Sequence, residues 1–148
     1  MIFGEFSGQT DEKGRIRIPA RLKPFLGDAL TITKGTNGCL FIFGAEQWHD
    51  DLAMKLTGVP MTDLGAQRSL RMFFSSANAL EEDNQGRSLL PRNLREFAGL
   101  VKDIVFIGVG NRAELWAKER YDAYMAGKVE PTTVDFDKLF AELGKYGV

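Results

Sequence analysis

A pattern of aspartate, glycine and arginine occurs twice in the sequence, 72 positions apart. It reads "DEKGRIRIPARL" at residues 11–22 and "DNQGRSLLPRNL" at residues 83–94. Aligned without a gap from the first aspartate to Gly27 and Gly99, the two copies agree at Asp, Gly, Arg, Pro, Leu, Phe and Gly. We interpret them as two copies of one structural unit, and the chain as a tandem repeat.

The first copy has the residue types of a tight turn that carries positive charge. Asp11 can accept backbone hydrogen bonds in such a turn, and Gly14 can adopt backbone angles that other residues avoid. The turn could be purely structural, with an arginine paired to the aspartate across it. It could also bind DNA, because "GRIRIP" places Arg15 and Arg17 on one face of a strand, with Lys13 at the tip. Guanidinium groups bind phosphate or the acceptor edge of guanine, and an antiparallel ribbon fits the major groove.

The two copies differ on the polar face of that strand. Where the first copy has Arg17, the second has Leu89. We therefore hypothesise that the first turn makes the stronger contact with DNA. Several such turns at a fixed spacing would gain avidity on a DNA that repeats its own sequence.

Other candidate chemical groups have simpler interpretations. The single histidine, His49, lies in a helix-like stretch without a nucleophile motif, and we expect it at the surface of a helix. Cys39 lies in an apolar stretch, where we expect a small buried thiol. One histidine and one cysteine provide no ligand spacing for zinc. We expect no cofactor, no metal and no enzymatic activity.

The stretch "GVGNRA" at residues 108–113 matches a dinucleotide-binding pattern. In that interpretation Gly110 would approach a pyrophosphate and Glu130 would bind a ribose. Too little chain follows for further parallel strands, and the matching place in the first copy reads as a hairpin. We favour a hairpin here too, and keep a nucleotide-binding enzyme as a third alternative.

Each repeat predicts the same order of elements: strand, turn, strand, short helix, strand, strand, helix. Residues 2–10 are expected to be the partner strand of "GRIRIP", so that the motif forms a hairpin tip. Pro19 and Pro91 are well placed to begin the short helices. Gly99 would end the second helix, and Pro24 would shorten or bend the first.

Further helices are predicted outside the motifs. Residues 46–58 and 118–127 follow the paired strands at matching places, and residues 62–77 open with a Thr/Asp cap. The end of the chain predicts an amphipathic helix that docks on the body or on a neighbouring subunit. Its apolar positions are Phe136, Leu139, Phe140 and Leu143.

The composition is that of an ordinary globular protein. Of 148 residues, 44% are apolar and 26% are charged, and the net charge is −1, with basic residues gathered at both motifs. No stretch approaches the length of a membrane span, no secretory signal is evident, and a single cysteine forms no internal disulfide, which favours the cytosol. Repeats of roughly 70 residues bury little surface alone, so we expect a shared core and oligomerisation.

The sequence resembles the MraZ family of bacterial transcriptional regulators, which are built from two tandem SpoVT-AbrB-like units. The resemblance rests on "DEKGRIRIP" and "DNQGRSLLP", which both give D-x-x-x-R, and on "LREFAGLVKDIVFIGVGNRAELW" after the second motif. It implies an α+β, mainly β fold. The expected architecture is a pseudo-dimeric swapped-hairpin AbrB-like barrel with peripheral helices, formed from units at residues 1–76 and 77–148.

The resemblance also implies a function. Family members form ring-shaped homo-oligomers and bind double-stranded DNA with short, direct, G-rich repeats upstream of their own operon. That operon typically begins a division and cell-wall gene cluster, and the protein commonly represses it. The chain would then be cytoplasmic and associated with the nucleoid.

The matching motif positions imply roles for individual residues. Arg15 and Arg87 would be the DNA-contacting arginines, joined by Lys13 and Arg17 from the polar face of the first strand. The residues that shape the two turns would be Asp11, Gly14, Asp83 and Gly86.

A different class of protein is the main alternative. It is a ring-forming assembly or antitoxin-like protein without specific DNA binding.

Overall fold

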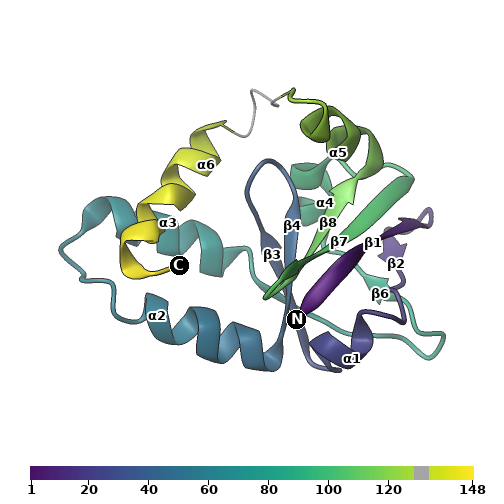
Figure 1. Ribbon diagram of the computed structural model, residues 1–148, viewed down its shortest axis with the longest axis horizontal. Coiled ribbons are helices and arrows are strands. Elements are labelled where there is room, and N and C mark those ends of the chain that lie inside the picture. The colour runs from purple at the N-terminus through teal and green to yellow at the C-terminus, as the bar shows by residue number, and fades with distance from the viewer. Residues whose placement is uncertain (129–133) are drawn as a thin grey trace.

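The computed structural model describes residues 1–128 and 134–148 and contains both predicted repeats (Figure 1). The first repeat consists of β1 (Ile2–Gln9), β2 (Arg15–Ile16), α1 (Lys23–Leu26), β3 (Leu30–Lys34), β4 (Leu40–Gly44) and a helix formed by the π-helical η1 (Gln47–Ala53) and α2 (Met54–Leu56). The second consists of β5 (Asn78–Leu80), β6 (Ser88–Leu89), α4 (Arg92–Ala98), β7 (Asp103–Gly110), β8 (Ala113–Ala117) and α5 (Lys118–Met125). The predicted order of elements within each repeat is confirmed.

Among the described residues, three further helices lie outside the repeat order. α3 (Leu64–Ser75) connects the repeats and begins as predicted, with the Asp63 carboxylate accepting the Ala66 N–H at 3.1 Å. α6 (Val134–Ala141) and the 3₁₀ helix η3 (Glu142–Tyr146) end the chain. Of the predicted apolar positions there, Leu143 is buried and Phe140 packs against the same cluster. The side chains of the other two, Phe136 and Leu139, lie outside what the structure describes. No helix among the described residues is long and apolar enough to cross a membrane.

The strands of the two repeats interleave in one antiparallel sheet. Its order is β1-β7-β8-β4-β3-β5. β1 of the first repeat pairs with β7 of the second, β5 of the second pairs with β3 of the first, and β4 and β8 join the halves. Each repeat therefore gives its first strand to the other, as in a swapped dimer within one chain, and the α+β, mainly sheet class is confirmed. The pairs formed by the described strands leave β1 and β5 at the two ends of the sheet. Closure into a barrel, and the boundary between residues 76 and 77, remain predictions.

A two-stranded ribbon joins the two motifs. β2 and β6 pair antiparallel, with Arg15 opposite Leu89 and Ile16 opposite Ser88. The prediction that residues 2–10 form the partner strand of the first motif is wrong. β1 pairs with β7 along all of its 8 residues, and β2 pairs instead with its counterpart in the other repeat. The chain still reverses at the motif, but the strands on either side of the turn enter different sheets.

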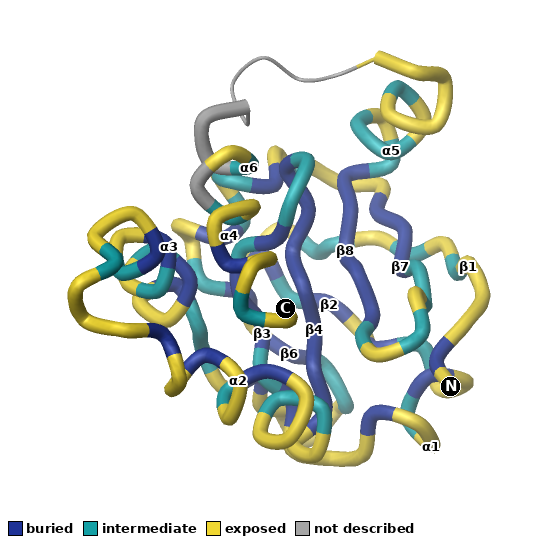
Figure 2. Tube along the Cα trace, turned by 60° about the vertical axis from the view of Figure 1, so that its left-hand side comes forward, coloured by how far each residue is buried: buried dark blue, intermediate teal, exposed yellow. Residues whose placement is uncertain are grey.

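Apolar side chains cover both faces of the six-stranded sheet at its centre, where Figure 2 shows β4 and β8 as buried. β4 is buried along its whole length. Leu40 and Ile42 belong to one apolar cluster, whereas Phe41 and Phe43 belong to the other, as the alternation of a strand requires. The first cluster includes Ile16 of the ribbon and side chains of α1 and α4, and the second includes side chains of α2, α3 and η3. The ribbon is thus held on the sheet by its apolar side.

The two short helices begin at different places relative to the motif. α4 follows Pro91 and ends at Gly99, which has a φ of 64°, as predicted. In the first repeat the helix begins at Lys23, so the prediction that Pro19 begins it is wrong. Proline is compatible with the first turn of a helix but not with its interior, and Pro24 therefore sets the start.

The centre of the sheet provides a test of the shared core. Ile42 is 0% exposed in the strand that joins the two halves. Ile42→Ala should lower the free energy of unfolding by about 2 to 5 kcal/mol, because it removes buried methyl groups and leaves a cavity. Chemical denaturation measures the loss. Val101→Ala, at a residue that is 87% exposed, is the control and should change stability by less than about 0.5 kcal/mol. Equal effects of the two substitutions would contradict a core shared through β4.

Candidate nucleic-acid interface

The first motif turn is built around one carboxylate. The Asp11 N–H donates to the Arg15 carbonyl and the Gly14 N–H donates to the Asp11 carbonyl, both at 3.0 Å. Asp11 Oδ1 accepts the N–H groups of Lys13 and Arg15, each at 2.9 Å. Asp11 Oδ2 accepts Arg15 Nε at 2.5 Å. The aspartate therefore closes the turn and holds the arginine side chain at the same time.

The second motif turn repeats this set of bonds. The Asp83 N–H donates to the Arg87 carbonyl at 2.7 Å, and the Gly86 N–H to the Asp83 carbonyl at 3.0 Å. Asp83 Oδ1 accepts the N–H groups of Gln85 and Arg87 at 2.8 and 2.9 Å, and Oδ2 accepts Arg87 Nε at 3.2 Å. The repeated aspartate, glycine and arginine thus form the same turn in both repeats.

These bonds act on the ionised form of both aspartates. The backbone N–H of Arg15 is the largest cause that lowers the pKa of Asp11, and the guanidinium group adds to it. The backbone N–H of Arg87 lowers the pKa of Asp83 in the same way. Only the Nε of each guanidinium group bonds to its aspartate, and the Nη groups of these two arginines form no hydrogen bond with the described residues. Each of these arginine side chains remains 25% exposed.

The glycine of each turn has a backbone conformation that favours glycine. The φ angle is 84° at Gly14 and 75° at Gly86, in the left-handed region. Gly14 also lies against a side chain of the other repeat, since a Cβ at this position would be 2.5 Å from Arg95 Nη1. A larger residue at Gly14 would therefore strain the turn and displace Arg95.

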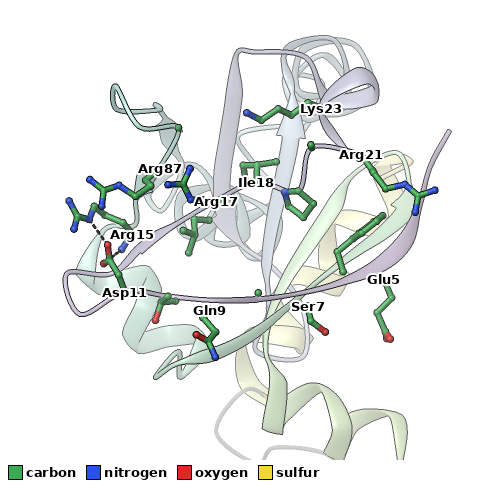
Figure 3. A pocket seen from close by; sticks show the side chains of 17 residues that line it. Glu5, Ser7, Gln9, Asp11, Arg15, Arg17, Ile18, Arg21, Lys23 and Arg87 are labelled. Carbon is green, nitrogen blue, oxygen red and sulfur yellow. Dashed lines mark hydrogen bonds and ion pairs between the residues drawn. The ribbon is translucent and has the colours of Figure 1, made fainter.

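The ribbon brings Arg15, Arg17 and Arg87 together at one end of a groove (Figure 3). The groove has a volume of about 1080 Å³ and lies between β1 and the segment from Arg15 to Lys23. Arg21 lies toward its other end. Basic side chains outnumber acidic ones in the lining, which gives the groove a positive potential that attracts polyanions. They are Arg15, Arg17, Arg21, Lys23 and Arg87, against Glu5 and Asp11.

The predicted alternation along the first motif is correct. Ile16 and Ile18 are buried, Arg17 and Lys13 are exposed, and Arg15 is partly buried by its pairing with the aspartate. The structure thus places the three predicted DNA-binding arginines near one another, with Lys13 within the first turn.

Several contacts between the two repeats were not predicted from the sequence. Arg17 Nη1 donates to the Gln85 carbonyl at 2.5 Å, and Lys23 Nζ forms an ion pair with Glu82 at 2.6 Å. The Leu90 N–H donates to the Gly14 carbonyl at 3.1 Å. Only one signal pointed to such contacts, namely that position 23 and its counterpart 95 are both basic. Lys23 reaches Glu82, next to the second turn, and Arg95 reaches Gly14 in the first turn.

His49 and Cys39 lie where the sequence predicted, the histidine at the surface of a helix and the cysteine in the interior. His49 lies in η1 with its side chain 69% exposed, and its Nδ1 is 2.7 Å from Asp50 Oδ1. Cys39 is buried, which raises its pKa well above 9.0.

Residues 108–113 form the hairpin between β7 and β8, so the dinucleotide interpretation is wrong for this stretch. Glu130 lies outside the described residues. Within the described part of the chain, no group of three or more His, Cys, Asp or Glu side chains could hold a metal ion.

Fold and site together define a class of protein: an α+β tandem repeat in which two equivalent turns, joined by a ribbon, each present an arginine. The model of one family, described as "MraZ protein, putative antitoxin-like", matches residues 1–63 and 73–142. The chain belongs to the MraZ family.

Curated relatives named "Transcriptional regulator MraZ" match most or all of the chain. The relative from Clostridium beijerinckii is 40% identical over 148 residues, which is 100% of both chains. Those from Heliobacterium modesticaldum and Desulforamulus reducens are 47% and 45% identical, over 84% and 85% of this chain and 86% and 88% of their own. The shared name supports a transcription regulator, and it is not the name of an enzyme class.

Acid should loosen both turns. A folded-state pKa below the ordinary value of 3.8 means that the charged aspartates stabilise the turns above that pH. This contribution is lost as the pH falls from 3.8 through the lowered pKa. NMR titration of the two carboxyl groups should therefore give midpoints below 3.8. In Arg15→Ala the pKa of Asp11 should rise toward 3.8 while that of Asp83 stays unchanged as an internal control. A midpoint for Asp11 at or above 3.8 in the unsubstituted protein would contradict the bond set.

Proposed function

We propose that this protein is a sequence-specific DNA-binding transcriptional regulator that represses its own operon, in a division and cell-wall gene cluster, by binding short direct repeats. The observation that carries the proposal is the equivalence of the two turns. Each uses the same bonds to hold one arginine by its Nε, and the ribbon presents both at one end of a basic groove. The name of the relatives supports the same function.

Arg15 and Arg87 are proposed to read DNA directly. A guanidinium group whose Nε is bound to its own carboxylate keeps both Nη groups for the O6 and N7 atoms of guanine or for a phosphate. Because the aspartate already orients the arginine side chain, binding to DNA would cost less conformational entropy. Asp11, Gly14, Asp83 and Gly86 shape the turns in this proposal, and Lys13 adds a charge for the phosphate backbone.

The protein is further proposed to act as a homo-oligomer, in a ring. A pair of turns on one chain reads little sequence, and several chains on repeated DNA would gain affinity through avidity. Exposed apolar side chains support contacts between subunits. Phe3 is 68% exposed, and its ring lies 6.3 Å from that of Phe25, which is also exposed. A regulator of this kind works in the cytoplasm, on the nucleoid.

Equilibrium binding to DNA tests the proposal. The purified protein should bind a duplex from upstream of its own gene more tightly than a scrambled duplex, by about 4 kcal/mol or more. Arg15→Ala should abolish this difference, and Arg87→Ala should reduce it less, because the bond from Arg87 Nε to Asp83, at 3.2 Å, orients its guanidinium group less firmly than the 2.5 Å bond from Arg15 Nε to Asp11. A larger loss from Arg87→Ala would contradict the predicted order of the two turns.

Equal, weak binding of both duplexes would favour the second candidate. This is a ring-forming assembly or antitoxin-like protein without specific DNA binding, which the description of the matching family model favours. In that case the turns would be structural, and Arg15→Ala would alter folding or assembly without an effect on DNA.

The dependence of DNA binding on salt concentration should distinguish base recognition by Arg15 from phosphate binding by Lys13. Binding should weaken steeply as salt rises, because each phosphate contact releases counterions. Lys13→Ala should lower the salt slope by about 1 and weaken native and scrambled duplexes by the same factor. Arg15→Ala should instead remove the preference for the native duplex. Fluorescence anisotropy across a series of salt concentrations measures both, and a loss of preference in Lys13→Ala would contradict its assignment to phosphate.

A further inference from the structure

Arg17 connects the two turns. It follows the first turn in the sequence, yet its Nη1 donates to the carbonyl of Gln85, inside the second turn, at 2.5 Å. The same nitrogen lies 3.4 Å from the place where a Cβ on Gly86 would be. The side chain is exposed, so this contact is made at the surface where DNA would approach.

The bond to Gln85 leads directly to the second arginine. Gln85 donates its N–H to Asp83 Oδ1 at 2.8 Å, and Asp83 Oδ2 accepts Arg87 Nε at 3.2 Å. The peptide that Arg17 holds therefore lies between the aspartate and the arginine that it orients. Displacement of this peptide would move the guanidinium group of Arg87.

The first turn lacks the matching bond. In the ribbon, Ile16 lies opposite its own counterpart Ser88, so Leu89 stands beside the first turn as Arg17 stands beside the second. Leu89 is 61% exposed and has no side-chain donor. The first turn is held to the other repeat by a backbone bond instead, from Leu90 to Gly14. The side-chain link at this position is therefore specific to the second turn.

We propose that Arg17 is a positioning residue, which holds Arg87 at a set place relative to Arg15 and thereby determines the spacing of the contacts that the two turns make on DNA. The inference rests on the proposed function and deepens it. One of the two Nη groups of Arg17 is already bound to protein, and the second copy has leucine at this position. A shared contact of both turns with DNA thus has no need of this guanidinium group.

Hydrogen exchange tests the link without DNA. Arg17→Met keeps the length of the side chain but removes its donors and charge. Exchange of the Gln85, Gly86 and Arg87 amides, which all donate within the second turn, should become several-fold faster. The equivalent amides of Lys13, Gly14 and Arg15 should not change. Arg21→Met is the matched control, because it removes the same charge from the same groove, while the guanidinium group of Arg21 lies over the Phe6 ring and not on either turn.

The affinity for DNA tests whether Arg17 determines the relative position of the two turns. The positions that the two turns contact are mapped by footprinting on the duplex from upstream of the gene, and one or two base pairs are inserted between these positions. The unsubstituted protein should lose about tenfold in affinity on insertion. Arg17→Met should lose much less on insertion, because its second turn adapts, while Arg21→Met should keep the full penalty and weaken all duplexes alike.

Two results would overturn the inference. One is unchanged amide exchange in the second turn of Arg17→Met. The other is a penalty for insertion as large in Arg17→Met as in Arg21→Met. Failure of the proposed function is seen separately, as equal binding of native and scrambled duplexes by the unsubstituted protein. That result would remove the assignment of Arg17 to the spacing of DNA contacts whatever the exchange data show.

Discussion

Strand pairing between the two repeats is the constraint on which the rest of the molecule depends. β2 has 2 residues and finds its partner in the equivalent strand of the other repeat. β1 and β5 pair with strands of the opposite repeat as well. A single repeat would therefore leave several strands without partners and much apolar surface in water. The two copies of the motif have to be made in one chain, or brought together by association, before either turn is held in place.

The ribbon that results from this pairing places the two turns at the surface of the molecule. Its inner side carries Ile16 into the core, and its outer side carries the two turns. A ribbon buried on one side cannot rotate or slip by one residue without exposing its apolar side chains. The arginines are consequently placed by the hydrophobic effect, although their own contacts are polar. Local bonds from Asp11 and Asp83 then set the direction of each guanidinium group.

The pseudo-symmetry is imperfect around the two turns. Lys23 pairs with Glu82 beside the second turn, whereas the counterpart of Glu82 in the first copy is Thr10, which bonds a backbone carbonyl. Glu82 offsets the charge of Lys23 beside the second turn, while Arg17 adds a positive charge there that Leu89 does not add beside the first. The two turns therefore share one geometry but lie among different charges.

The sequence alone determined what is local. The repeated Asp, Gly and Arg define the turns, alternation separates Ile16 from Arg15, and capping residues mark α3 and α4. The tertiary structure decided which strands pair. Residues 2–10 are an ordinary strand that could have paired with its neighbour, and the choice of β7 depends on burial of both faces of the sheet, to which many distant residues contribute. For the same reason the contact of Arg17 with Gln85 could not be predicted from the sequence. It joins positions 68 apart that only the antiparallel register of the ribbon brings together.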